Sequence, residues 1–200
     1  MLVKICGITR PEDAARAVAL GAGAIGFIFW PGSPRFVDPY RARAIVRSIP
    51  AFVTTVGVFV NQPPDEINGV AAVAGLSAVQ LHGDESADTL PAIKRPVIKA
   101  LSRIDESVLT AWDERVTLLI DAHDPVRRGG TGERADWTQA ALVAQKRRVV
   151  LAGGLSADNV RAAIRQVSPF GIDVSSGVES SPGIKDHQKL TAFFEALHQS

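Results

Sequence analysis

The amino-acid sequence predicts an α/β fold in which eight strand–helix units close into one single-domain (β/α)8 barrel. Three observations support this prediction. Short runs rich in β-branched residues recur at regular intervals, each run precedes a stretch with helical spacing of apolar residues, and no linker or low-complexity segment divides the 200 residues. Apolar strands that alternate with helices require a parallel sheet covered by helices, and eight such units can form a ring.

The elements follow one another from the first residue to the last. Strands are predicted at about 2–6, 24–29, 52–60, 77–82, 97–101, 116–121, 148–152 and 170–175. Helices are predicted at about 11–20, 39–48, 64–74, 86–92, 105–113, 137–145, 156–166 and 186–198, several opened by Pro, Asp or Ser. An open doubly wound sheet is the competing architecture, but its first turn usually carries a glycine fingerprint that GITRP lacks. We expect one domain over residues 1–200.

Composition limits the possible functions. With 46% hydrophobic and 22% charged residues, the chain is expected to be an ordinary globular protein, and no apolar run approaches the roughly 20 residues of a membrane span. The formal net charge of +1 and the mixed charges give no basic stripe for nucleic acid. The single cysteine, Cys6, excludes an internal disulfide and a cysteine-based metal site. We expect a cytoplasmic protein that binds neither nucleic acid nor membrane, and the sequence does not indicate an oligomeric state.

The barrel prediction places several polar side chains at one site. Residues at the carboxyl ends of barrel strands converge on a single rim, and side chains alternate between the two faces of a strand. If the apolar residues of each strand face the helices, the following side chains point inward: Lys4 and Cys6, Gln80 and His82, Thr117, Leu119 and Asp121, and Asp173 and Ser175.

Each of these residues also has a structural interpretation. A lone cysteine such as Cys6 is more often a small buried apolar residue than a reactive group. Asp121 could cap a loop, although a carboxylate at the end of an apolar strand is costly unless it is paired or useful. Asp173 and His82 could likewise have structural roles. From geometry alone, both interpretations remain open.

Glycine turns follow the last two predicted strands. The segment VVLAGGLSADNV contains Gly153 and Gly154, and VSSGVESSPGIKD contains Gly177. Glycine turns after strands seven and eight of a barrel usually bind phosphate through backbone N–H groups. The alternative is that these glycines only permit tight turns. A third glycine-rich segment, DAHDPVRRGGTGERADW, is long for a connection and is expected to be a lid or binding loop, although GGTG is not a nucleotide-binding motif.

Together these motifs resemble the phosphoribosylanthranilate isomerase family of tryptophan biosynthesis. The resemblance runs in order from Lys4 to Asp186 through KICGIT, GFIFWPGSPR, VGVFVN, VQLHGDE, the GGTG loop with its DW pair, LAGGLSADNV, IDVSSGVE and PGIKD. It implies a (β/α)8 barrel that converts N-(5-phosphoribosyl)anthranilate to 1-(2-carboxyphenylamino)-1-deoxyribulose 5-phosphate, an Amadori rearrangement. It also implies that no cofactor or metal takes part.

The resemblance further implies roles for particular residues. Cys6 is expected to be the general base and Asp121 the general acid. Arg35 is expected to bind the anthranilate carboxylate, and His82 and Asp173 are expected to contact the substrate. The phosphate group is expected at Gly153, Gly154, Ser176 and Gly177.

The proposed chemistry requires the two catalytic groups to be tuned in opposite directions. A free thiol with a pKa near 8.5 is only a few per cent thiolate at neutral pH, and Lys4 is a candidate for stabilising the thiolate of Cys6. An aspartic acid donates a proton near neutral pH only if burial or the substrate favours its protonated form.

Other functions compete with this one. The histidine-pathway isomerase would look similar at the phosphate loops but would carry an aspartate in place of Cys6, and indole-glycerol-phosphate synthase would need catalytic lysines, a glutamate and an N-terminal extension. A non-catalytic barrel that binds a phosphorylated ligand is a third alternative, although both Cys6 and Asp121 are present.

Overall fold

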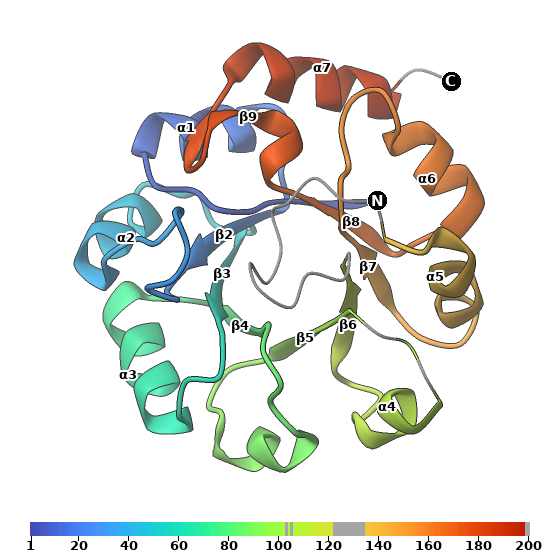
Figure 1. The fold of residues 1–200 in the computed structure, drawn as a ribbon. Coiled ribbons are helices and arrows are strands. Elements are labelled where there is room, and N and C mark those ends of the chain that lie inside the picture. Colours follow the sequence, from blue (N-terminus) through green and yellow to red (C-terminus); the bar gives the residue numbers. More distant parts are fainter. Residues whose placement is uncertain (103, 105, 122–134, 199–200) are drawn as a thin grey trace.

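The protein, described here from a computed structural model, forms a closed barrel of eight parallel strands surrounded by helices (Figure 1). The structure describes residues 1–102, 104, 106–121 and 135–198. The strands lie in sequential order, and β1 pairs with β8 to close the ring. Their bounds are β1 Leu2–Ile5, β2 Ala24–Ile28, β3 Thr54–Phe59, β4 Ala78–Leu81, β5 Val97–Leu101, β6 Thr117–Ile120, β7 Val149–Leu151 and β8 Gly171–Val174. The predicted fold class is therefore confirmed.

The helices form the outer ring (Figure 1). They are α1 Pro11–Ala19, α2 Pro39–Val46, α3 Pro64–Ala74, η1 Ala87–Ala92, α4 Glu106–Ala111, α5 Trp137–Ala144, α6 Val160–Val167 and α7 His187–His198. Proline occupies the start of α1, α2 and α3, where its missing N–H has no helical partner to lose. Asp38 and Asp136 cap α2 and α5 by accepting hydrogen bonds from two backbone N–H groups each.

The structure differs from the prediction at three places, and the first two differences have local causes. The predicted helix at 86–92 is a short 3-10 helix, because Pro91 lies inside it and cannot donate an α-helical hydrogen bond. Helix α6 begins at Val160 rather than near 156, because the side chain of Asn159 bonds back to Ser156 N and Gly154 O and holds the preceding turn. A hairpin of β9 (Glu179–Ser181) and β10 (Ile184–Lys185) was not predicted.

Side chains on the two faces of the strands form separate cores. Val3, Ile5, Leu118 and Ile172 face outward and pack with apolar residues of the helices. Smaller clusters fill the barrel interior, one built on Leu119 and the other on residues of β2, β3 and β4. The predicted alternation is therefore confirmed on these strands. It leaves the inward residues at the carboxyl ends available for a site at the barrel mouth.

Candidate active site

The first group at the mouth surrounds the thiol of Cys6, which directly follows β1. Lys4 and Asp173 are register partners on β1 and β8, and the Lys4 Nζ donates to an Asp173 carboxylate oxygen at 2.9 Å. All three side chains are buried. Gly26 on β2 makes room for them, since a Cβ there would lie 2.9 Å from the Cys6 sulfur and 3.1 Å from Lys4 Cε. The thiol thus lies inside the barrel and beside a buried ion pair.

Burial controls the protonation of this thiol. It raises the pKa of Cys6; Lys4 and Lys185 oppose the rise, while the carboxylate of Asp173 adds to it. Burial also disfavours the Lys4 ammonium, but Asp173 and Cys6 outweigh that effect and the pKa of Lys4 is raised. The effect of Lys4 therefore has the direction predicted from the sequence, but burial is stronger. In the free protein Cys6 is a thiol, and Lys4 is a cation held beside it.

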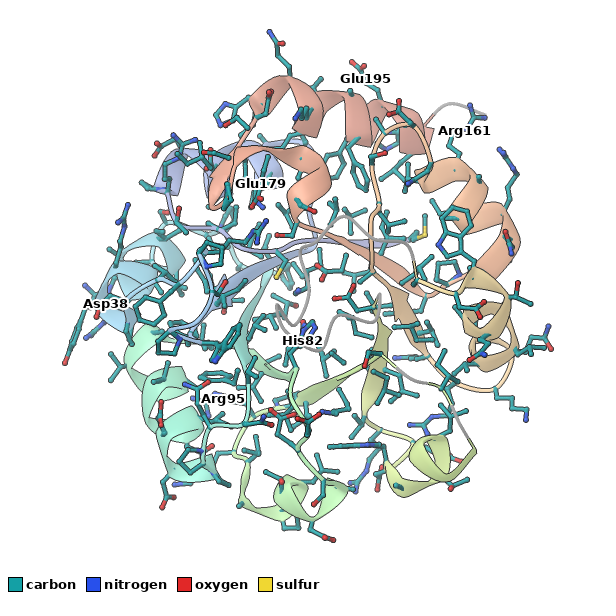
Figure 2. All side chains as sticks on the ribbon, viewed as in Figure 1. Asp38, His82, Arg95, Arg161, Glu179 and Glu195 are labelled. Carbon is teal, nitrogen blue, oxygen red and sulfur yellow. The ribbon has the colours of Figure 1, made fainter. Side chains whose placement is uncertain are left out.

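The second group lies at the carboxyl ends of β4 and β6 and centres on Asp121, which directly follows β6. Its carboxylate lies 3.3 Å from His82 Nε2, and the two side chains are only 11% and 14% exposed. The other ring nitrogen, Nδ1, lies 2.8 Å from the side-chain nitrogen of Gln80. Because an amide nitrogen only donates hydrogen bonds, His82 accepts from Gln80 at Nδ1, and Nε2 is the ring nitrogen that faces Asp121. Figure 2 shows His82 at the centre of the ring of strands.

Arg35, in the loop after β2, is also buried, and it forms an ion pair with Glu179 of the hairpin. Its Nε lies 3.0 and 3.1 Å from the two carboxylate oxygens of Glu179, and its Nη2 lies 2.7 Å from one of them. Lys185, on the other hairpin strand, donates to the same carboxylate at 2.8 Å. Burial raises the pKa of Glu179, but Arg35 and Lys185 outweigh that effect and lower it.

The turns after β7 and β8 meet at the same end of the barrel. Gly153 and Gly154 have φ values of 82° and 59°, in the left-handed region that favours glycine. A Cβ at Gly177 would overlap the carbonyl oxygen of Leu155, so only glycine lets these two turns approach so closely. Within the described part of the chain, the backbone N–H groups of Gly153, Gly154, Ser176 and Gly177 have no acceptor. Such N–H groups are suited to bind an anion.

Comparison with known proteins identifies the family. The family model for N-(5'-phosphoribosyl)anthranilate (PRA) isomerase matches residues 3–196. The chain belongs to this family. A protein of Pelobacter propionicus named N-(5'-phosphoribosyl)anthranilate isomerase is 52% identical over 200 residues, which cover 99% of this chain and 96% of the relative. The family and enzyme class predicted from the sequence are thereby confirmed.

Solved structures of PRA isomerases have the same fold. The enzyme of Thermus thermophilus is 41% identical, with a TM-score of 0.90 and 98% of each chain covered. A second PRA isomerase, also 41% identical, has a TM-score of 0.84 with 98% of this chain and 97% of that chain covered. It was solved in complex with reduced 1-(o-carboxyphenylamino)-1-deoxyribulose 5-phosphate.

In this member of the PRA isomerase family, the structure brings the predicted residues Cys6, His82, Asp121 and Asp173 to one mouth. It adds two buried residues that the sequence analysis missed, Glu179 and Lys185. The Pro182–Gly183 pair was the available signal, because such a pair often marks the turn of a hairpin. The predicted lid, most of DAHDPVRRGGTGERADW, lies outside the described residues.

Proposed function

We propose that the chain performs the PRA isomerase rearrangement with Cys6 as the general base and Asp121 as the general acid. One observation carries this proposal: Cys6 and Asp121 directly follow β1 and β6 at the carboxyl ends of the barrel strands, and their side chains are 6% and 11% exposed. Two proton transfers on one sugar need two such groups.

The rearrangement has two steps, opening of the furanose ring and removal of the proton from C2. Asp121 gives a proton to the furanose ring oxygen, the bond from C1 to that oxygen breaks, and the aniline nitrogen forms a Schiff base with C1. Cys6, as the thiolate, then takes the proton from C2, and the electron pair of that C–H bond forms the enolamine. The enolamine becomes the ketone when C1 gains a proton and the C2 hydroxyl loses one. Lys4 and Lys185 are the cations that stabilise the thiolate.

The remaining parts of the substrate fit the other groups. The phosphate would bind the backbone N–H groups of Gly153, Gly154, Ser176 and Gly177, and Arg35 would bind the anthranilate carboxylate. His82 and Asp173 would contact the sugar between them. Across the parts of the chain that the structure describes, no helix is long and apolar enough to cross a membrane. We propose that the chain acts in the cytoplasm on this small phosphorylated substrate.

Substitution of the two catalytic groups tests the mechanism. Cys6→Ser keeps the size but gives a far weaker base, and Asp121→Asn removes the acid, so each should lower kcat by about 10²- to 10⁴-fold. Anthranilate attached to the sugar fluoresces, so the rate follows from fluorescence after mixing with freshly generated substrate. Asp113→Asn is the matched control, because Asp113 forms an exposed ion pair with Arg115. Activity within about tenfold of the parent would refute the role of the substituted residue.

A further inference from the structure

A buried ion pair joins the loop after β4 to the neighbouring strand β5. Lys99 Nζ and a carboxylate oxygen of Glu85 lie 2.7 Å apart, and each side chain is only 4% exposed. The strand neighbours Ile98 and Ala100 pack in the barrel interior, so Lys99 points to the outer side of β5. There its Nζ lies 5.5 Å from the centre of the Trp112 ring, a cation–π distance.

This ion pair binds both backbone groups of Gly83, the residue that directly follows His82. The two carboxylate oxygens of Glu85 accept from the Gly83 N–H at 3.1 and 2.9 Å, and Lys99 Nζ donates to the Gly83 carbonyl oxygen at 2.7 Å. The backbone N–H of His82 itself donates to the carbonyl oxygen of Phe59 on β3 at 2.8 Å. The backbone of His82 is therefore fixed on both sides.

The carboxylate of Glu85 also binds the loop after β3. The backbone N–H of Asn61 donates to it at 2.8 Å, and the Asn61 side-chain oxygen accepts from the N–H of Asp84 at 2.7 Å. A Cβ at Gly83 would overlap the Asn61 side chain, so glycine is needed for this approach. Hydrogen bonds to an ionised carboxylate are stronger than those to a neutral acceptor. Glu85 thus joins the loops after β3 and β4 into one unit next to His82.

The position of His82 matters because its ring lies between Gln80 and the proposed acid. Nε2 lies 3.3 Å from the carboxylate of Asp121, and Nδ1 lies 2.8 Å from the side-chain nitrogen of Gln80. Gln80 holds the ring, but the distance from the ring to Asp121 also depends on where the His82 backbone lies. A misplacement of about 1 Å in an active site lowers the rate about 10²-fold.

We propose that Glu85 and Lys99 are positioning residues, which hold His82 and through it the carboxyl group of Asp121 in the orientation for proton transfer to the furanose ring oxygen. This inference rests on the proposed role of Asp121 as the general acid. Neither Glu85 nor Lys99 touches the substrate in this proposal. Their effect on the reaction passes through the imidazole.

Glu85→Gln tests the proposal. It keeps the size of the side chain but places an amide nitrogen beside the Lys99 ammonium, so two donors oppose each other and the hold on Gly83 is weakened. We expect kcat to fall about tenfold, while the inhibition constant of reduced 1-(o-carboxyphenylamino)-1-deoxyribulose 5-phosphate changes less than about threefold. Fluorescence gives the rates, expressed per folded molecule, and competition gives the inhibition constants.

A double variant separates positioning from a purely structural role. If Glu85 acts through His82, its substitution has no further effect once the imidazole is gone. Glu85→Gln combined with His82→Gln should then have the kcat of His82→Gln alone, within about twofold. A further loss in the double variant, or an unchanged kcat in Glu85→Gln, would overturn the inference. Glu195→Gln is the matched control on the outer side of α7 (Figure 2), and it should change neither kcat nor the inhibition constant.

If Glu85→Gln does not fold, Glu85→Asp carries the test. It keeps the negative charge opposite Lys99, but the side chain is one methylene shorter and cannot also reach Gly83 and Asn61. It should lower kcat at an unchanged inhibition constant, and this loss should disappear in the background of His82→Gln. Any other result contradicts the proposal.

Asp121→Asn distinguishes failure of this inference from failure of the proposed function. If Asp121→Asn keeps activity within about tenfold of the parent, the proposed acid is wrong. If Asp121→Asn and His82→Gln both lower kcat while Glu85→Gln does not, only the positioning role is wrong. If His82→Gln retains full kcat, the positioning role is wrong whatever Asp121 does. Losses in all three variants, with no further loss in the double variant, support the two proposals together.

Discussion

The two sides of the barrel mouth control proton transfer in different ways. On the side of β1 and β8, full charges lie next to the thiol: Lys4 pairs with Asp173 at 2.9 Å, and both contribute to the pKa of Cys6. On the side of β4 and β6, the carboxylate of Asp121 lies 3.3 Å from His82 Nε2, and Nδ1 of the same ring is hydrogen-bonded to the side-chain amide of Gln80. On the first side, full charges act on the thiol of Cys6. On the second side, the imidazole of His82 orients the carboxylate of Asp121.

This difference follows from what each proposed catalytic group requires. A buried thiol ionises only if a cation compensates the loss of water, so Cys6 needs Lys4 close by. A general acid needs an orienting partner that does not add a positive charge, because a cation would favour its ionised form. The imidazole of His82, whose Nδ1 is hydrogen-bonded to the amide of Gln80, lies in position to orient Asp121. The comparison therefore predicts that substitutions on the charged side have the larger effects on stability.

The largest effect is expected for Asp173→Asn. This substitution leaves the Lys4 ammonium buried opposite an uncharged amide, and breaking a buried ion pair in this way costs about 3–5 kcal/mol. Urea unfolding measures the loss. The double variant Lys4→Met with Asp173→Leu removes both charges and should regain much of it. A loss below about 1 kcal/mol for the single variant would show that the two sides do not differ as described.

A smaller loss is expected on the other side for His82→Gln. The change removes the 3.3 Å contact with Asp121 and the hydrogen bond with Gln80, and it leaves no buried ammonium opposite an uncharged amide. We expect a loss of about 1–2 kcal/mol in the free energy of unfolding, from the same urea experiment. A loss equal to that of Asp173→Asn would contradict the comparison.

The smallest effect is the pH dependence that Cys6 contributes to stability. The folded-state pKa of the thiol is raised above its unfolded value of about 8.5. Below that value the thiol is protonated in both the folded and the unfolded state, so it does not change the free energy of unfolding. As pH rises toward the folded pKa, only the unfolded state ionises, so the native state loses stability. Between about pH 7.5 and 9.5, the parent should lose about 1 kcal/mol more than Cys6→Ala. Parallel pH profiles would show that burial does not control this thiol.

The sequence predicted the features that depend on local patterns. Strand alternation placed Cys6, His82 and Asp173 on the inner face, because the side-chain period of a strand is fixed. The glycine turns could be located for a similar reason, since their residue types are required by backbone geometry. Prediction failed where a partner is distant in the chain. Arg35 and Glu179 are 144 residues apart, and no local pattern indicates that they meet.

The hairpin β9–β10 has a consequence for how this protein can change. Among the described strands, β9 and β10 pair only with each other, whereas the eight barrel strands close without them. Substitutions at its exposed residues, Ser180, Ser181 and Ile184, would leave the registers of the cylinder intact. Evolution or laboratory selection could thus try substrates with other aromatic groups by varying residues between Glu179 and Lys185, while the proposed catalytic pair, Cys6 and Asp121, is inherited unaltered.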